Sequence, residues 1–271
     1  MRYRAKKSLP PQKSRPNRDK RNYSLFKELA FVLIVSLLTC LLAKKGSFLG
    51  LVPWALSTLP HELGHAIPSW WMGIVALPTF TITLQLSAKK QLWVFAVQLF
   101  LCYQVFKVGR YFSSKLITAL PFLWVLAAVI CSLFLTDSVQ EQFIIWSGNA
   151  GQQAFGTAMI ALGFAFGPNL AWVRKQFYAL YVWGGIILSS AAWNWRQSKA
   201  DPSLVPFGGY GETSGDSEMS NGDIDRLIND FNWTMDEVIS SYNSFSIWCV
   251  VFLLALFFLA LGFRPQTEPT S

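Results

Sequence analysis

Long apolar stretches recur along this chain and set its overall pattern. Each approaches the roughly 20 residues that a helix needs to cross the hydrocarbon core of a bilayer. Because backbone polar groups inside a bilayer must be satisfied within their own segment, the pattern predicts an all-α polytopic membrane protein with six to seven transmembrane helices. The stretches comprise residues 25–43, 48–72, 92–108, 116–136, 143–166, 177–195 and 245–263.

A different period follows the second stretch. Between residues 77 and 86, the polar residues Thr79, Thr81, Thr83 and Gln85 alternate with apolar ones. Alternation at every second position is typical of a strand with two unlike faces. We therefore expect a short β-ribbon beside the membrane helices.

Composition and charge support an integral membrane protein with several crossings. Of the 271 residues, 52% are apolar and only 14% are charged, which is too apolar for an ordinary soluble domain. The net charge of +8 does not indicate a nucleic-acid partner, because nine basic residues are gathered before the first apolar stretch. Under the positive-inside rule this tail is cytoplasmic. Seven full crossings would place Lys107 and Arg110 on the opposite side, whereas six, with a segment 92–108 that does not fully span, would keep them in the cytoplasm.

One polar segment interrupts the apolar pattern and is expected to end in two short helices. Ile224, Leu227 and Ile228 have helical spacing, and Thr234 with Glu237 matches a capping box that opens a second helix. The expected parts of the chain are a basic cytoplasmic tail (1–23), a membrane domain (24–195), a polar loop with the short helical pair (196–244), a last transmembrane helix (245–264) and a tail (265–271).

Residues 61–65 read His-Glu-Leu-Gly-His and lie inside an apolar stretch, where ionisable residues are costly and indicate function. On a helix, His61 and His65 stack on one face and can hold one metal ion through their ring nitrogens. Glu62 lies about 100° round the helix, beside the metal. In metalloproteases with this spacing, the glutamate takes a proton from a water that zinc has acidified. The motif contains both histidines of the chain.

The motif and its surroundings resemble the site-2-protease family of intramembrane zinc proteases. The matching residues are Leu59-Pro60-His61-Glu62-Leu63-Gly64-His65-Ala66, and the period-two segment after them is similar to the strand that follows the motif helix in that family. The resemblance implies Zn²⁺ as the cofactor, His61 and His65 as its ligands, Glu62 as the general base and membrane-associated proteins as substrates.

The third metal ligand does not follow from the motif. The family's aspartate stands in an Asp-Gly pattern that the later apolar stretches lack, and residues 143–195 contain no acid. That region offers an amide cluster between small residues, which would let a helix pack closely on the motif helix. We predict Gln152, or its neighbours Asn149 and Gln153, as the third ligand or as a polar partner between helices. The alternatives are Cys102, Cys131 and an acid from residues 216–236.

The favoured function is an intramembrane zinc metalloprotease that hydrolyses peptide bonds of membrane-associated proteins within the lipid bilayer. An extended substrate would then add to the edge of the predicted strand, at Thr79, Thr81 and Thr83. The alternative is a metal-binding, proteolytically inactive relative that binds membrane proteins, and the missing aspartate favours it. A transporter fits less well, because the sequence has no paired broken helices and no scattered charges in the apolar stretches.

Overall fold

The computed structural model describes residues 18–42, 51–87, 89–111, 115–166, 174–206 and 222–262. The protein is mostly helical, as predicted, with one two-stranded sheet. Most of the expected basic tail and the whole carboxyl-terminal tail lie outside the described residues. In chain order the elements are α1 (Arg18–Leu42), α2 (Leu51–Trp71), β1 (Ala76–Pro78), β2 (Thr83–Gln85), α3 (Leu92–Tyr111), α4 (Lys115–Val129), the π-helical turn η2 (Ile130–Phe134), α5 (Asp137–Phe166), α6 (Arg174–Ser198), the short 3₁₀ turn η4 (Pro202–Leu204), α7 (Asp223–Asn229) and α8 (Met235–Gly262).

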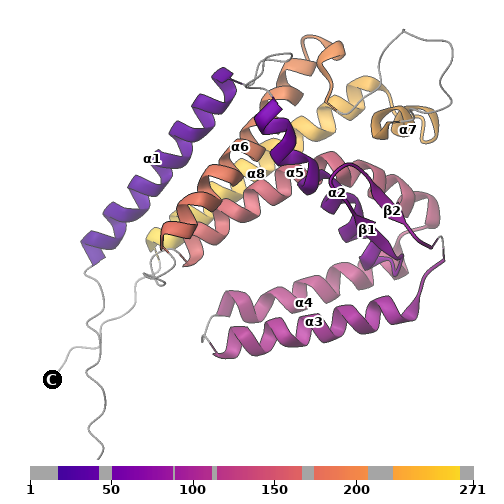
Figure 1. Ribbon diagram of the computed structural model, residues 1–271, viewed down its shortest axis with the longest axis horizontal. Helices are drawn as coiled ribbons and strands as arrows, with labels where there is room; N and C mark the ends of the chain where they lie inside the picture. Colours follow the sequence, from indigo (N-terminus) through magenta and orange to yellow (C-terminus); the bar gives the residue numbers. More distant parts are fainter. Residues whose placement is uncertain are drawn as a thin grey trace, which may run out of the picture.

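Four long helices, α1, α5, α6 and α8, form the main bundle (Figure 1). Its core is apolar: Leu25 on α1, Tyr181 on α6 and Phe257 on α8 are each at most 2% exposed and belong to one cluster. α5 and α6 come closest at Gly156 and Gly184, where a Cβ added to either glycine would lie 2.7–2.8 Å from the carbonyl oxygen of the other. Small residues at such contacts let helix backbones approach.

The motif helix α2 packs across α5 through glycines. A Cβ added to Gly64 would lie 2.2 Å from the carbonyl oxygen of Ser147, and one added to Gly151 would lie 2.3 Å from the Cα of Gly64. Backbone atoms cannot move aside as a side chain can, so neither position accepts a side chain without a shift of the helices. The predicted close packing of this region on the motif helix is confirmed.

A two-stranded antiparallel hairpin follows α2, which confirms the predicted β-ribbon. Ala76 pairs with Gln85, and Pro78 pairs with Thr83. The continuous strand expected from residue 79 onward is wrong, because residues 79–82 form the turn. There the Thr79 hydroxyl oxygen accepts a hydrogen bond from the Ile82 amide at 3.1 Å. A threonine side chain can bond to the nearby backbone in this way, and the alternation of residue types does not reveal it.

Three helical segments are long and apolar enough to cross a membrane: Leu92–Tyr111, Ile117–Phe134 and Met235–Leu259. Within the described residues this count falls short of the six to seven predicted spans. Helices α2 and α5 carry the metal motif and the amide cluster, which lower their hydropathy. Those polar side chains are turned inward, since His61 is 5% exposed and Asn149 is fully buried. A count of apolar stretches does not separate helices with a polar inner face from helices that span the membrane.

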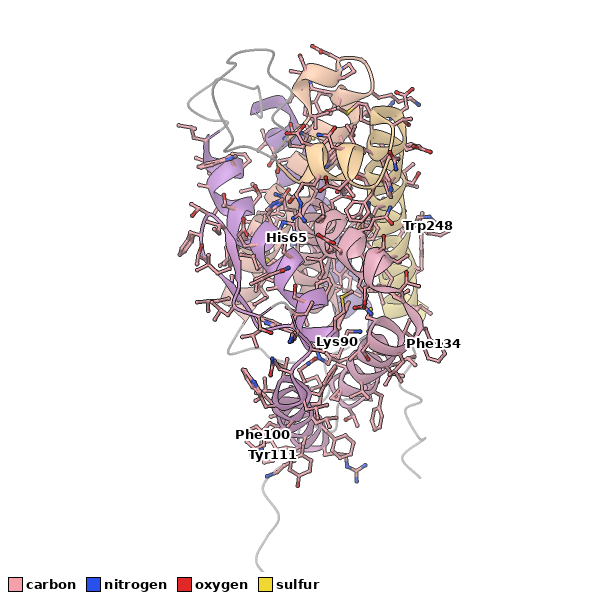
Figure 2. The ribbon with its side chains drawn as sticks, turned by 90° about the vertical axis from the view of Figure 1, so that its right-hand side faces the viewer. His65, Lys90, Phe100, Tyr111, Phe134 and Trp248 are labelled. Atoms are coloured by element: carbon pink, nitrogen blue, oxygen red, sulfur yellow. The ribbon has the colours of Figure 1, made fainter. Side chains whose placement is uncertain are left out.

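Helices α3 and α4 form an antiparallel pair that stands apart from the main bundle (Figure 1). Its outer face is apolar and exposed, with Phe100 at 61% and Phe122 at 64% exposure. In the view of Figure 2 this pair, with Phe100 and Tyr111, lies below His65 of helix α2. An exposed apolar surface on two long apolar helices is what a bilayer would cover.

The polar segment ends in α7 and α8, and its last boundary differs from the prediction. The capping box is confirmed: the Thr234 amide donates to Glu237 Oε2 at 2.7 Å, and the Glu237 amide donates to Thr234 Oγ1 at 3.2 Å. The helix that it opens continues to Gly262 as α8. The expected short helix and the expected transmembrane helix 245–264 are therefore one element, since no Gly or Pro separates them.

Candidate metal centre

Helix α2 presents His61 and His65 on one face, as the i, i+4 spacing predicted. Their Nε2 atoms are 3.2 Å apart, and their rings meet edge to face with centroids 4.8 Å apart. The carbonyl oxygen of Ile144 on α5 lies 2.8 Å from His65 Nδ1. Because a carbonyl only accepts, Nδ1 of His65 carries a proton, and Nε2 is the ring nitrogen that faces His61.

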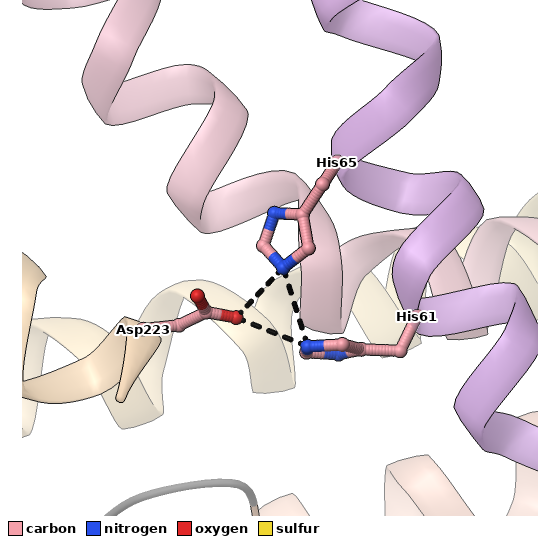
Figure 3. A group of neighbouring side chains, drawn as sticks. All are labelled: His61, His65 and Asp223. Carbon is pink, nitrogen blue, oxygen red and sulfur yellow. Dashed lines mark hydrogen bonds and ion pairs between the residues drawn. The ribbon is translucent and has the colours of Figure 1, made fainter. Parts of the chain in front are cut away.

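The third member of the cluster is Asp223, in the first turn of α7 (Figure 3). Its Oδ2 atom lies 3.1 Å from His61 Nε2 and 3.0 Å from His65 Nε2. The side chains of His61, His65 and Asp223 are only 7%, 12% and 17% exposed. Together the three residues could hold a metal ion. The two histidines that the sequence indicated are thus joined by a carboxylate from a distant segment.

Two buried apolar side chains fix α7 in place. Ile224 and Leu227 are 1% and 0% exposed and pack in a cluster that includes Trp195 of α6. On its outer side, the Arg226 guanidinium lies 2.8 Å from Glu141 Oε1 of α5. An exposed ion pair of this kind contributes little, so the apolar cluster must supply most of the docking energy.

The electrostatic environment keeps Asp223 ionised. Burial raises the pKa of its carboxyl group, but hydrogen bonds and charge interactions with His61 and His65 outweigh burial and hold the pKa well below its usual range. A carboxylate in this state can act as a ligand without first losing a proton.

Helix α5 shapes the site from behind with small residues. A Cβ added to Gly148 would lie 2.3 Å from Nε2 of His65 and 2.9 Å from Oδ2 of Asp223. A side chain at this position would occupy the space in which the three ligand atoms meet. Gly148 therefore leaves room for the cluster.

Glu62 is 5% exposed and is not a member of the His61, His65 and Asp223 cluster. The Thr83 hydroxyl lies 2.8 Å from both the backbone oxygen and the Oε2 atom of Glu62. Strand β2 is thereby attached to the motif helix. Of the three threonines predicted to bind substrate, Thr83 contacts the site, whereas Thr79 and Thr81 lie in the exposed hairpin turn.

The group that could hold a metal ion contains Asp223 and none of the predicted amides. Gln153 bonds to α8 instead: its Oε1 accepts from Ser246 Oγ at 2.8 Å, and its Nε2 donates to the Tyr242 oxygen at 3.4 Å. Asn149 and Gln152 are buried on the same helix, at 0% and 2% exposure, and the prediction that they are polar partners between helices stays open.

The two cysteines considered as ligands lie elsewhere. Cys102 faces an apolar cavity beside Trp124, and Cys131 packs with Met72. Neither is part of the described ligand cluster. The remaining alternative, an acid from residues 216–236, is the one that the structure supports.

No protein-family model, curated protein or solved structure matches this chain. Three features of the chain itself bear on the class of protein to which it belongs. They are a mostly helical fold, three helical segments able to cross a membrane, and a His-His-Asp cluster that could hold a metal ion.

Proposed function

We propose that this chain is an intramembrane zinc metalloprotease of the site-2-protease type, which hydrolyses peptide bonds of membrane-associated proteins. The observation that carries the proposal is the convergence of His61, His65 and Asp223 within 3.2 Å of one another, beside Glu62. Two imidazoles and a carboxylate are the donor set of many catalytic zinc sites, in which a fourth position stays open for water.

The size of the cluster supports zinc. Ligand atoms about 2.0–2.1 Å from a tetrahedral zinc ion are separated from one another by about 3.3 Å. The three observed separations, 3.0, 3.1 and 3.2 Å, approach one face of such a tetrahedron. A shared cation also accounts for two ring nitrogens that face each other, since two protonated imidazoles at this distance would repel.

Each residue then has a role in hydrolysis. His61, His65 and Asp223 would hold zinc, which supplies acidification of a water and polarisation of the scissile carbonyl. Glu62 would act as the general base, accepting a proton from the attacking water and returning it to the leaving nitrogen. Thr83, bonded to Glu62 Oε2, orients the carboxylate for this transfer.

The membrane placement belongs to the same proposal. We infer a multi-pass membrane protein, because the exposed apolar faces of α3 and α4 need lipid around them. Under the positive-inside rule, the nine basic residues before the first apolar stretch favour a cytoplasmic amino-terminal tail. The second candidate is a metal-binding relative that binds membrane proteins without cleaving them. It is favoured by the hydrogen bond that already engages Glu62 Oε2.

The test compares wild type with His61→Ala and Glu62→Gln. We expect His61→Ala to lose both zinc and cleavage. Glu62→Gln should keep zinc and lose cleavage by about 10²- to 10⁴-fold, because the amide keeps the shape of the side chain and removes the base. Zinc is measured by elemental analysis, and cleavage by new amino termini in membranes from cells that lack this protein. Equal zinc in wild type and His61→Ala would refute the metal site, and zinc without cleavage in wild type would support the inactive relative.

A further inference from the structure

An apolar cavity of about 810 Å³ lies between the α3–α4 pair and the carboxyl end of α2. Val97 and Leu101 of α3, Leu123 and Ala127 of α4, and Trp71 of α2 line it. It is a space separate from the metal cluster, because none of the ligand residues forms part of its wall.

Two polar side chains of the wall, Gln98 and Trp70, are engaged in hydrogen bonds, whereas the buried Trp71 indole nitrogen has no hydrogen-bond partner among the described residues. The Gln98 side chain is 9% exposed; its Nε2 donates to the Trp70 oxygen at 2.6 Å, and its Oε1 accepts from Trp124 Nε1 at 2.9 Å. The Trp70 indole nitrogen donates to the Ala76 oxygen at 2.8 Å. An extended peptide would bring unpaired backbone groups to this wall, each costing several kcal/mol in an apolar environment. The wall therefore suits a mostly apolar ligand that has few hydrogen-bonding groups.

The volume of the cavity further restricts which ligand it can hold. A spanning helix, about 30 Å long and about 10 Å across, occupies on the order of 2,000 Å³, far more than the cavity. An acyl chain reaching through half of the roughly 30 Å hydrocarbon core occupies on the order of 400 Å³. One or two acyl chains match the cavity volume of about 810 Å³.

We propose that this cavity binds the acyl chains of a membrane lipid between α2 and the α3–α4 pair. Two of its walls, α3 and α4, are segments able to cross a membrane, so the occupant is drawn from the bilayer itself. The inference rests on the membrane placement proposed above and not on the metal site. Bound lipid would fill the space that separates the helix pair from the motif helix.

The test uses purified protein in detergent with an equimolar phosphatidylcholine that carries a photoreactive diazirine in the middle of one acyl chain. After irradiation, peptide mass spectrometry locates the adducts. We expect labelling at Val94, which is 5% exposed, and at Trp124 in the cavity to exceed labelling at the exposed Phe100 and Phe122 by roughly tenfold, because detergent competes with the lipid for the outer face. Even labelling of both faces would overturn the proposal, whether or not any variant folds.

Matched variants then test occupancy. Ala127→Trp places an indole in the cavity and should lower the cavity labelling roughly tenfold, whereas Ala119→Trp, on the exposed side of the same helix, should leave it unchanged. Equal labelling of the two variants would count against the site. An added poly-leucine transmembrane peptide should not compete; if it displaces the lipid, the cavity receives a helix and the acyl-chain proposal is wrong. His61→Ala should label as wild type does, which separates this outcome from that of the metal site.

Discussion

Asp223 joins the two histidines of the candidate metal centre from α7, and the same helix offers a control residue. We expect Asp223→Asn to weaken zinc binding by roughly 100-fold, because an amide oxygen is a far poorer zinc ligand than a carboxylate. Asp225→Asn removes the same charge from α7 at a position outside the cluster and should leave affinity nearly unchanged. A chelator titration of both variants measures the difference. Equal affinities would show that Asp223 is not a ligand.

The same titration decides the role of the amides. Gln152→Ala and Asn149→Ala should bind zinc as wild type does, since Asp223 already fills the third position. A loss of affinity comparable to that of Asp223→Asn would restore an amide as the ligand.

Thr83 is a positioning residue for Glu62, and its hydroxyl can be removed with little change of shape. We expect Thr83→Val to retain zinc and to lower kcat about tenfold while KM changes little, because the hydrogen bond to Glu62 Oε2 orients the base. Thr83→Ser should recover the rate, and Thr81→Val, in the exposed turn, should behave as wild type. If Thr83→Val changes KM alone, Thr83 binds substrate, as the sequence suggested.

The histidines and Glu62 could be predicted because five consecutive residues determine their arrangement on one helix. Asp223 could be predicted only as one acid within residues 216–236. Which acid reaches the histidines depends on the docking of Ile224 and Leu227 into a cluster built from several helices. Local sequence does not encode that contact. The amides drew attention because they lie in an apolar stretch, but Gln153 has a partner on α8 that the sequence does not show.

The contact between helices α2 and α5 depends on glycine. We expect Gly64→Ala to lower stability by about 1–3 kcal/mol, because its Cβ would lie 2.2 Å from a backbone oxygen of α5. Gly185→Ala is the matched control: its Cβ would meet side-chain atoms and no backbone, with Val35 at 3.2 Å and the Ser36 hydroxyl at 3.8 Å. Alanine also favours the helix over glycine by up to about 1 kcal/mol, so this control should be neutral or slightly stabilised.

Thermal unfolding in detergent measures both glycine variants. If Gly64→Ala and Gly185→Ala have equal Tm values, the packing of α2 on α5 does not depend on glycine at position 64, and the prediction is wrong. Zinc binding should weaken in parallel for Gly64→Ala, because α5 also supplies the Ile144 oxygen that orients His65.

Element types were predictable and their ends were not. Long apolar runs gave helices, and the period-two segment gave a hairpin. The joined helix α8 and the turn at residues 79–82 were missed for different reasons. Helix α8 continues from a polar segment into an apolar one without a break. The turn at residues 79–82 depends on a hydrogen bond to the Thr79 side chain. Periodicity reports which faces are apolar and does not locate such junctions.

The directions of the helices bear on how many times the chain crosses the membrane. In Figure 1 the start of α1, the end of α5, the start of α6 and the end of α8 lie at the lower left, and α7 lies at the upper right. The ends of α3 and α4 that carry Arg110 and Lys115 also point to the left. The sequence suggested that residues 92–108 are too short to span, but α3 extends over 20 residues and is long enough.

We propose a different reason for six crossings. α2 descends to the right into the β-hairpin, and α3 runs from the hairpin back to the left, the side on which α1 begins (Figure 1), so that α2 and α3 together would amount to one crossing. In this proposed topology Lys107, Arg110 and Arg174 share a side with the start of α1, as the positive-inside rule would require. α7 and Asp223 would then lie on the opposite side.

Single cysteines test this topology after Cys40, Cys102, Cys131 and Cys249 are replaced. We expect Arg110→Cys to react with a membrane-impermeant maleimide only from the side of the amino-terminal tail, and Asp230→Cys, whose native side chain is 50% exposed beside the metal centre, only from the other side. A cysteine within the basic tail, in place of Ser14, marks the tail side as the reference. Labelling is read on sealed vesicles before and after permeabilisation. If Arg110→Cys and Asp230→Cys react from the same side, α2 and α3 each cross fully, and the basic residues at the end of α3 lie opposite the tail.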